Sequence, residues 1–268
     1  MTAIFAGFDR KDYPGDATMQ TLWSDTNLYW CGFYLGPSYN WGPHYSKIKA
    51  MGWGVAPIYF RQAALAPILQ AIKKKYENDP AAREAALYEV GRGDGAEAVL
   101  QASNAGVQPQ SIIYYDREKK GTDPAHLLDP LWLTYYRGWS RELLARQFGA
   151  GLYSAPIIAD WVMSSLMTLP GFDIIIPYIW VAKYTEKAPH GSAIPPEFFR
   201  KDPFPEPHPT RFCASASSWQ HLGNCRLRWT ELSVPSRPKR HELSPADLNT
   251  SIYRDPGRGI LGAITNMA

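Results

Sequence analysis

Two rhythms of hydrophobic and polar positions alternate along the first two thirds of the chain. Short runs rich in β-branched and aromatic residues predict strands at residues 3–9, 30–35, 54–60, 111–116, 151–155 and 173–182. Longer segments with helical spacing predict helices at residues 17–23, 45–51, 81–89, 94–105, 130–148 and 157–168. Strands that alternate with helices are typical of parallel βαβ units. We therefore expect an α/β fold of the TIM-like (β/α) barrel type.

The helical pattern between residues 61 and 93 is longer than a normal crossover between two strands. Asn78-Asp79-Pro80 divides it into two helical stretches, which predicts an inserted helical hairpin near the barrel rim. Asp94 is placed to cap the helix that follows, and Gly106 stands where a C-terminal glycine is expected.

The pattern changes after about residue 186, where closely spaced prolines interrupt any helix. We expect a proline-rich loop over residues 186–211, followed by two last strands, at 212–221 and 246–253, without full helices between them. The 268 residues suit one barrel domain, which typically takes about 250 residues. The sequence thus predicts a single barrel over residues 1–268 whose last strands lack regular helices.

The composition is that of a globular protein with a sizeable core, 45% hydrophobic and 20% charged. The formal charge of +3 is not concentrated in an arginine-rich helix, so nucleic acid is not an expected partner. The two basic clusters, at residues 73–75 and 237–240, are short enough to be solvated surface features. No stretch approaches the roughly 18 apolar residues of a membrane span, and the first residues do not read as a signal peptide.

The cysteines and glycines exclude several kinds of site. Cys31, Cys213 and Cys225 have no metal-ligand spacing, so no metal site is expected. Cys213 and Cys225 are spaced for a disulfide across a β-hairpin, and two free thiols remain an equal alternative. The glycine-rich stretch 91–95 lacks the Lys-Ser/Thr of a phosphate loop, which argues against nucleotide binding.

Carboxylates and tyrosines stand at the ends of predicted strands, where the side chains of a (β/α) barrel converge on one mouth. Asp9 ends the first strand and Asp116 the fourth, and Glu118 shares a face with Asp116 because the two are two residues apart. Carboxylates gathered in one cleft have pKa values that are pushed apart, so that one donates a proton while another stays charged. Glycoside hydrolysis needs this division of roles. Each carboxylate taken alone is more often a helix cap or a loop residue.

Aromatic side chains suit the apolar faces of sugar rings. Those near strand ends are candidates for substrate binding, with packing in the barrel core or rim as the alternative: Tyr34, Tyr59, Tyr153, Trp180 and Trp219.

Several short motifs occur in an order that resembles a known family. They are Gly7-Phe8-Asp9 with Tyr13-Pro14, Gly32-Phe33-Tyr34-Leu35-Gly36, Asp94 in a Gly/Ala setting, Ile113-Tyr114-Tyr115-Asp116-Arg117-Glu118, Gly151-Leu152-Tyr153-Ser154, Trp219-Gln220 and Asp247-Leu248-Asn249. Together they resemble the DUF1906 glycoside-hydrolase-like domains, relatives of the lysozymes of glycoside hydrolase family 25. The resemblance covers residues 1–185 and extends thinly over the last strands.

The resemblance implies roles for these residues and no cofactor. The related lysozymes cleave peptidoglycan with an Asp-x-Glu pair on the fourth strand. By position, Glu118 would be the general acid and Asp116 the nucleophile or the group that assists the N-acetyl oxygen of the substrate. Asp9 and Asp247 would tune the pair or hold the sugar, and Gln220 would join the substrate-binding residues. Arg117, a large cation, separates the two carboxylates, and the segments 61–93 and 186–211 would reshape or cover the cleft.

Two classes of function follow from the resemblance. The first is a hydrolase of a bacterial cell-wall glycan, peptidoglycan: an autolysin, a phage lysin or a delivered toxin, the last with an inhibitor or immunity partner. Without a signal peptide, such an enzyme would reach the periplasm or the cell exterior by non-classical export or lysis. The alternative is a catalytically inactive carbohydrate-binding barrel or an interaction module.

Overall fold

The fold is an α/β barrel. The computed structural model describes residues 5–26, 28–117, 128–167, 177–184, 222–229 and 246–251. Its strands follow one another in chain order, β1 to β8, around a closed barrel. They are β1 (Phe5–Asp9), β2 (Leu28–Tyr34), β3 (Gly54–Tyr59), β4 (Ile112–Arg117), β5 (Gly149–Ser154), β6 (Tyr178–Tyr184), β7 (Leu222–Trp229) and β8 (Ala246–Ser251). The TIM-like barrel predicted from the alternation of strands and helices is confirmed.

The last strand reverses direction relative to its neighbours. The pairs β1–β2, β3–β4, β4–β5 and β6–β7 are parallel, whereas β8 is antiparallel to both β7 and β1. An antiparallel neighbour needs no crossover helix. This pairing agrees with the expectation that the last strands lack regular helices.

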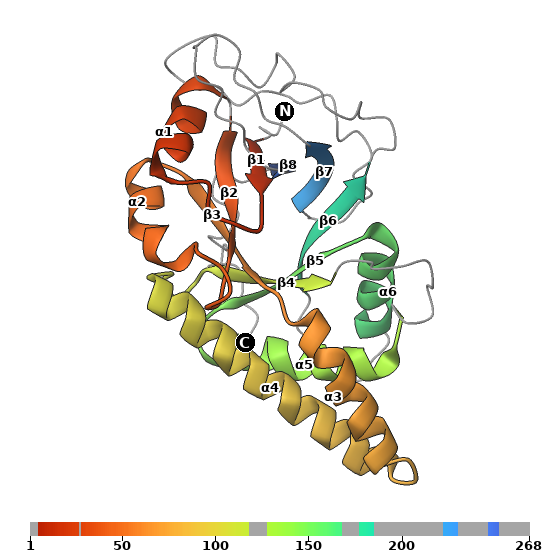
Figure 1. Cartoon of the computed structure of the whole chain (residues 1–268). Helices are drawn as coiled ribbons and strands as arrows, with labels where there is room; N and C mark the ends of the chain where they lie inside the picture. The colour runs from red at the N-terminus through yellow and green to blue at the C-terminus, as the bar shows by residue number, and fades with distance from the viewer. Residues whose placement is uncertain are drawn as a thin grey trace, which may run out of the picture. The chain divides into compact units, whose positions relative to one another are not determined.

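The chain divides into two compact units, which are described separately. The first contains β1, β2, β7 and β8, together with α1 (Asp16–Asp25), a 3-10 turn (Gly42–His44) and α2 (Tyr45–Ala50). Here α1 packs against β2 and α2 (Figure 1). Aromatic rings of this unit pack against one another. Trp53 lies edge-on to Phe8, with centroids 5.7 Å apart, and its ring lies 5.2 Å from that of Trp23.

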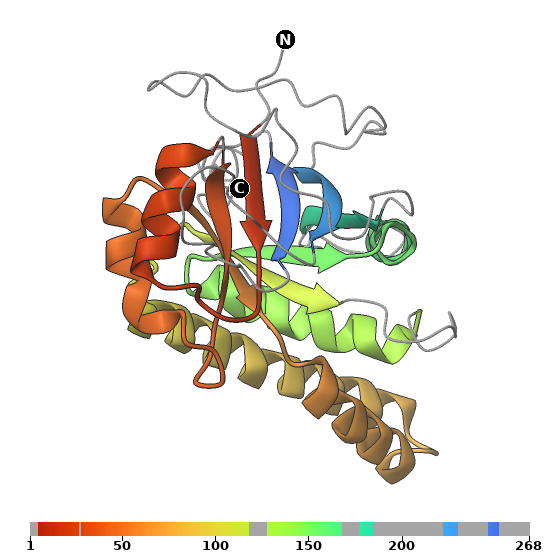
Figure 2. The same cartoon turned by 45° about the horizontal axis from the view of Figure 1, so that its top comes forward.

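The second unit holds β4, β5 and a layer of helices. These are α3 (Gln62–Lys75), α4 (Pro80–Ala105), α5 (Pro130–Ala145) and α6 (Pro156–Met167). Both views show α3 and α4 as a helical hairpin, with α5 running alongside α4 (Figures 1 and 2). The hairpin turns at the predicted Asn78-Asp79-Pro80.

One helix replaces the two that were predicted at residues 81–89 and 94–105. The helix α4 starts after Asp79, whose carboxylate accepts a hydrogen bond from the Ala82 amide at 3.0 Å, and runs without a break to Ala105. The prediction that Asp94 is a helix cap is therefore wrong, because Asp94 lies inside α4. Gly106 ends the helix with a φ of 95°, as expected.

Three glycines explain why α4 continues where the sequence suggested a break. A Cβ at Gly91 would collide with the Tyr135 carbonyl of α5, and a Cβ at Gly138 would collide with the Tyr88 carbonyl of α4. At Gly95 it would come within 2.8 Å of the Trp139 carbonyl oxygen. The glycines let the two helix backbones approach closely, and the packing gained compensates for their poor helix propensity.

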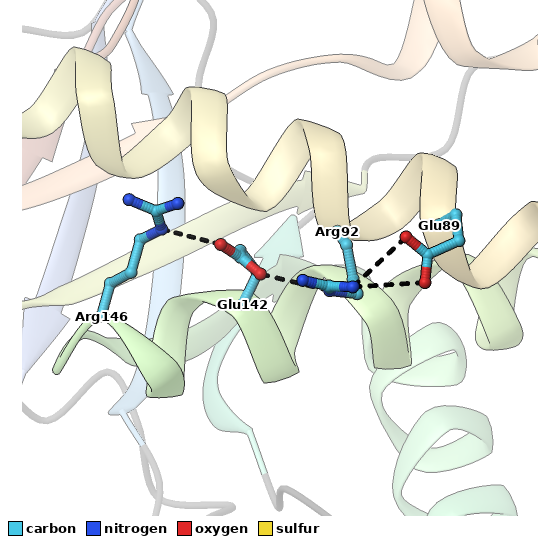
Figure 3. A network of polar contacts seen from close by, with 4 residues as sticks. All are labelled: Glu89, Arg92, Glu142 and Arg146. Atoms are coloured by element: carbon cyan, nitrogen blue, oxygen red, sulfur yellow. Dashed lines mark hydrogen bonds and ion pairs between the residues drawn. The ribbon is translucent and has the colours of Figure 1, made fainter.

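The α4–α5 interface carries a chain of ion pairs (Figure 3). Glu142 of α5 accepts hydrogen bonds from Arg146 at 2.7 Å and from Arg92 of α4 at 3.3 Å, and Arg92 also reaches Glu89 at 3.3 Å. The hydrogen bond from Arg146, followed by that from Arg92, lowers the pKa of Glu142, although burial acts in the opposite direction. Glu142 is buried, whereas both arginines are about half exposed.

Glu142→Gln is expected to lower the free energy of unfolding by about 1 kcal/mol at pH 7, since the arginines lose a buried charge partner but stay hydrated. A carboxylate with a lowered pKa stabilises the fold above its ordinary value of 4.5 and loses that contribution as the pH falls below it. The difference between variant and wild type should therefore shrink in urea denaturation at pH 3. Glu89→Gln, at the exposed end of this series of ion pairs, should leave the free energy of unfolding within about 0.5 kcal/mol of wild type. A difference for Glu142→Gln that is constant with pH would contradict the ion-pair interpretation.

The other predicted elements agree with the structure to within a few residues wherever they are described. The predicted proline-rich loop at 186–211 and the predicted strand at 212–221 lie outside the described residues. The strand β7, at Leu222–Trp229, was not predicted. Within the described ranges, no helix has the length and apolar character needed to cross a bilayer.

Candidate active site

Asp116 lies near the C-terminal end of β4 and is 2% exposed. Its neighbour Tyr115 points to α5, where its ring meets those of Trp132, Tyr135 and Trp139 at centroid distances of 5.8, 5.8 and 5.4 Å. Because successive side chains of a strand point to opposite faces, Asp116 lies on the face turned away from α5. In a barrel whose helices form the outer layer, that face is the interior.

Tyr153 is the neighbour of Asp116 on the adjacent strand. The two are register partners in the parallel β4–β5 pair, so their side chains share a face. Tyr153 is fully buried. Two residues earlier in both strands, the Tyr114 ring occupies the space where a side chain at Gly151 would stand. Two predicted site residues, Asp116 and Tyr153, thus lie side by side on one face of the sheet, and Tyr114 lies next to them on the same face.

Arg117 points the opposite way from Asp116. Its guanidinium carbon lies 4.2 Å from the centre of the Trp132 ring on α5, and the side chain is 6% exposed. Burial lowers the pKa of Arg117 to about 10, partly offset by the nearby Tyr115 and Asp129. The cation that separates the two carboxylates in the sequence therefore does not lie on the face of β4 that holds Asp116.

Asp9 ends β1 in the first unit and is 1% exposed. The antiparallel register pairs it with Asp247 of β8, and on the far side of β8 the same register pairs Asp247 with Arg228 of β7. The predicted residues Asp9 and Asp247 are thus adjacent positions of the sheet. Arg228 completes the row and was not singled out from the sequence, because its place there depends on a strand that was not predicted.

The loop that follows Asp9 is held by the segment after β2. The Trp41 indole N–H donates to the carbonyls of Arg10 and Lys11 at 3.2 and 3.1 Å, and the Tyr13 amide donates to Asn40 at 2.6 Å. These contacts fix the chain immediately after the predicted site residue Asp9.

A partly exposed charge cluster continues this anchoring. Asp16 accepts hydrogen bonds from Lys47 and from Tyr13, both at 2.7 Å, and lies 3.2 Å from His44. These two hydrogen bonds, with that from Lys47 the stronger influence, lower the pKa of Asp16 to about 2. The Tyr13 and His44 rings also stack, with centroids 4.0 Å apart.

Two predicted aromatic residues of the first unit pack against other rings. Trp180 is fully buried and lies edge-on to Trp30, with centroids 5.2 Å apart. Tyr34, at the end of β2, is 8% exposed and lies 5.1 Å from the ring of Tyr39 in the loop that follows.

Tyr59 belongs to a polar cluster on the helix side of the second unit. It is the register partner of Tyr115, and its hydroxyl donates to Glu97 of α4 at 3.2 Å. Next to it, Asp94 accepts hydrogen bonds from the Tyr135 hydroxyl at 2.7 Å and from Arg61 at 3.3 Å.

Burial raises the pKa of Asp94, although the hydrogen bond from Tyr135 and the charge of Arg61 act in the other direction. The cluster joins the end of β3 to α4 and α5. It was missed because Asp94 was taken for a helix cap.

Three predicted site residues, Glu118, Trp219 and Gln220, lie outside the described residues. The described residues contain no group of three or more His, Cys, Asp and Glu side chains that could hold a metal ion.

Comparison with known proteins gives one family match. The model of the Rv2525c-like, glycoside hydrolase-like domain matches residues 24–203. A search of curated proteins finds no match.

Three solved structures are similar. An uncharacterised B. stearothermophilus protein aligns at a TM-score of 0.54 and 19% identity, over 95% of this chain and 99% of that one, in agreement with the barrel fold. The modular autolysin LytC from Streptococcus pneumoniae aligns at 0.48 and 12%, over 92% of this chain and 46% of that one. The spore cortex lytic enzyme SleM from Clostridium perfringens aligns at 0.45 and 11%, over 92% and 67%.

Proposed function

Because the chain belongs to the Rv2525c-like glycoside hydrolase-like domain family, we propose that it hydrolyses a bacterial cell-wall glycan, peptidoglycan, by carboxylate catalysis. The observation that carries the proposal is the position of Asp116. Its carboxyl group is buried at the C-terminal end of a barrel strand, on the face turned away from the helices. Active sites of (β/α) barrels form at these strand ends.

In this proposal, Asp116 and Glu118 divide the chemistry. Glu118 protonates the leaving oxygen of the glycosidic bond, and Asp116 acts as nucleophile or assists the N-acetyl oxygen of the substrate. The Asp-x-Glu spacing supports the pairing, because residues two apart along a strand share a face. Tyr153, beside Asp116, is suited to orient that carboxylate or the sugar.

The remaining residues are assigned to substrate binding. Asp9 and Asp247, which the register places side by side, tune the acidic pair or hold sugar hydroxyls. Trp219 and Gln220 are proposed contacts of the glycan on the basis of their motif, and Tyr34 and Trp180 on the basis of their strand ends. The choice of peptidoglycan rests on the resemblance of these motifs to the lysozymes of glycoside hydrolase family 25.

The proposal is tested with purified peptidoglycan as substrate. We expect the wild-type protein to release soluble muropeptides with new reducing ends, which mass spectrometry after borohydride reduction identifies as muramic acid or glucosamine. The double variant Asp116→Asn/Glu118→Gln, checked for folding by circular dichroism, should release none. A wild-type protein that sediments with peptidoglycan but releases nothing would instead be a carbohydrate-binding barrel.

A further inference from the structure

The contact between Arg117 and Trp132 joins the end of β4 to the start of α5. The guanidinium carbon lies 4.2 Å from the ring centre, within the range in which a cation is attracted to the face of an indole. Both side chains are almost completely buried. A buried cation is costly unless its surroundings compensate for lost hydration. Because burial of the Arg117 charge is costly, its presence here indicates a specific role for this arginine.

The first turn of α5 supplies part of that compensation. Asp129 caps the helix by accepting a hydrogen bond from the Leu131 amide at 2.9 Å, and its charge favours the charged form of Arg117. Trp132 belongs to the same turn, because its amide donates to the Asp129 carbonyl at 3.0 Å. Arg117 and Asp129 directly flank residues 118–128 in the sequence. The last residue of β4 is thus tied to the first turn of α5.

The face on which Asp116 lies depends on the face that Arg117 takes. In a strand, a slip by one residue moves every side chain to the opposite face. Tyr115 and Arg117 both contact aromatic rings of α5, so together they hold the strand in the register that turns Asp116 away from the helix. Tyr115 meets α5 before Asp116 in the strand, and Arg117 meets it after Asp116.

We propose that Arg117, clasped against Trp132, is a positioning residue that keeps the end of β4 in register and Asp116 on the face turned away from α5. The effect on turnover rests on the proposed function, whereas the effect on the strand does not. Arg117 itself lies on the wrong face to contact a substrate held by Asp116, so its action is exerted through the backbone.

The test compares substitutions on the two sides of the contact. Arg117→Met keeps a long side chain but removes the cation, and Trp132→Leu removes the aromatic face. Both should speed backbone amide exchange at residues 115–117 by about tenfold or more, with little change in strands away from β4. On peptidoglycan, both should lower kcat by about 10- to 100-fold, with KM within a factor of two. Trp132→Phe, which keeps a ring face, should stay close to wild type in both measurements.

Two controls separate positioning from general destabilisation. Arg141→Met makes the same change at an exposed arginine of α5 and should alter neither exchange nor kcat. The double variant Arg117→Met/Trp132→Leu should be no worse than the more impaired single variant, because each change already breaks the contact.

The proposal fails if exchange at residues 115–117 is unchanged in Arg117→Met. It also fails if exchange rises while kcat stays at the wild-type value. If the wild-type protein has no hydrolase activity, the proposed function fails. Amide exchange alone then decides whether the contact between Arg117 and Trp132 holds the strand.

Discussion

Glu118→Gln is expected to lower hydrolysis of peptidoglycan by about 100- to 10,000-fold, the usual contribution of a general acid. The loss should depend on the leaving group. An aryl glycoside of a chitooligosaccharide expels a stable phenolate that needs little protonation, so the variant should keep a much larger share of its activity on that substrate. Paired rate measurements on the two substrates check this prediction.

Asp116→Asn provides the contrast. The proposed nucleophile or assisting group is needed whatever the leaving group is, so this variant should lose activity on both substrates alike. Asp160→Asn, at an exposed position of α6, controls for the removal of a carboxylate in itself. If both site variants lose activity equally on the two substrates, Glu118 is not the general acid.

Gly91→Ala is expected to destabilise the fold by about 3 kcal/mol, the upper part of the range for overpacking. The new methyl group would collide with the Tyr135 carbonyl, a backbone atom that cannot turn aside as a side chain can. Gly138→Ala, which meets the Tyr88 carbonyl from the other helix, should have an effect of similar size. Urea denaturation of the purified variants provides the measurement.

Gly93→Ala is the matched control, two residues along the same helix. A Cβ at Gly93 meets nothing within 4 Å, so alanine should only improve helix propensity and stabilise the protein by up to about 1 kcal/mol. The change from glycine to alanine is thus expected to destabilise the protein at position 91 and to stabilise it at position 93. Shifts of the same sign would show that close approach of α4 and α5 does not explain the glycines.

The predicted helices at residues 81–89 and 94–105 leave a gap that contains Gly91 and Gly93. Glycine weakens an isolated helix, but α4 continues through this stretch. The correct signal was present in the longer pattern. The positions that are buried in α4 repeat at helical spacing straight through the glycines: Leu87, Gly91, Asp94, Gly95, Ala98, Val99 and Ala102. Small residues on such a face indicate a close helix neighbour rather than a break.

Asp94 was assigned wrongly for a related reason, and the sequence left the contacts of Arg117 open. Both were interpreted from their neighbours in the sequence, Asp94 as a cap and Arg117 as a cation between the two carboxylates. In the structure each is defined by a residue distant in the chain, Asp94 by Tyr135 and Arg117 by Trp132. The energies that place buried charges come from such tertiary partners.

The sequence by itself determined the barrel class, most of the helices and strands, and the candidate residues at the strand ends. These follow from hydrophobic spacing and chain order, which are local properties. Tertiary structure alone decided that β8 runs antiparallel, that its register sets Asp247 beside Asp9, and that Arg117 rather than Asp116 faces α5. Strand direction, register and the partner of a buried charge depend on contacts between distant segments, and no local spacing specifies which segments will meet.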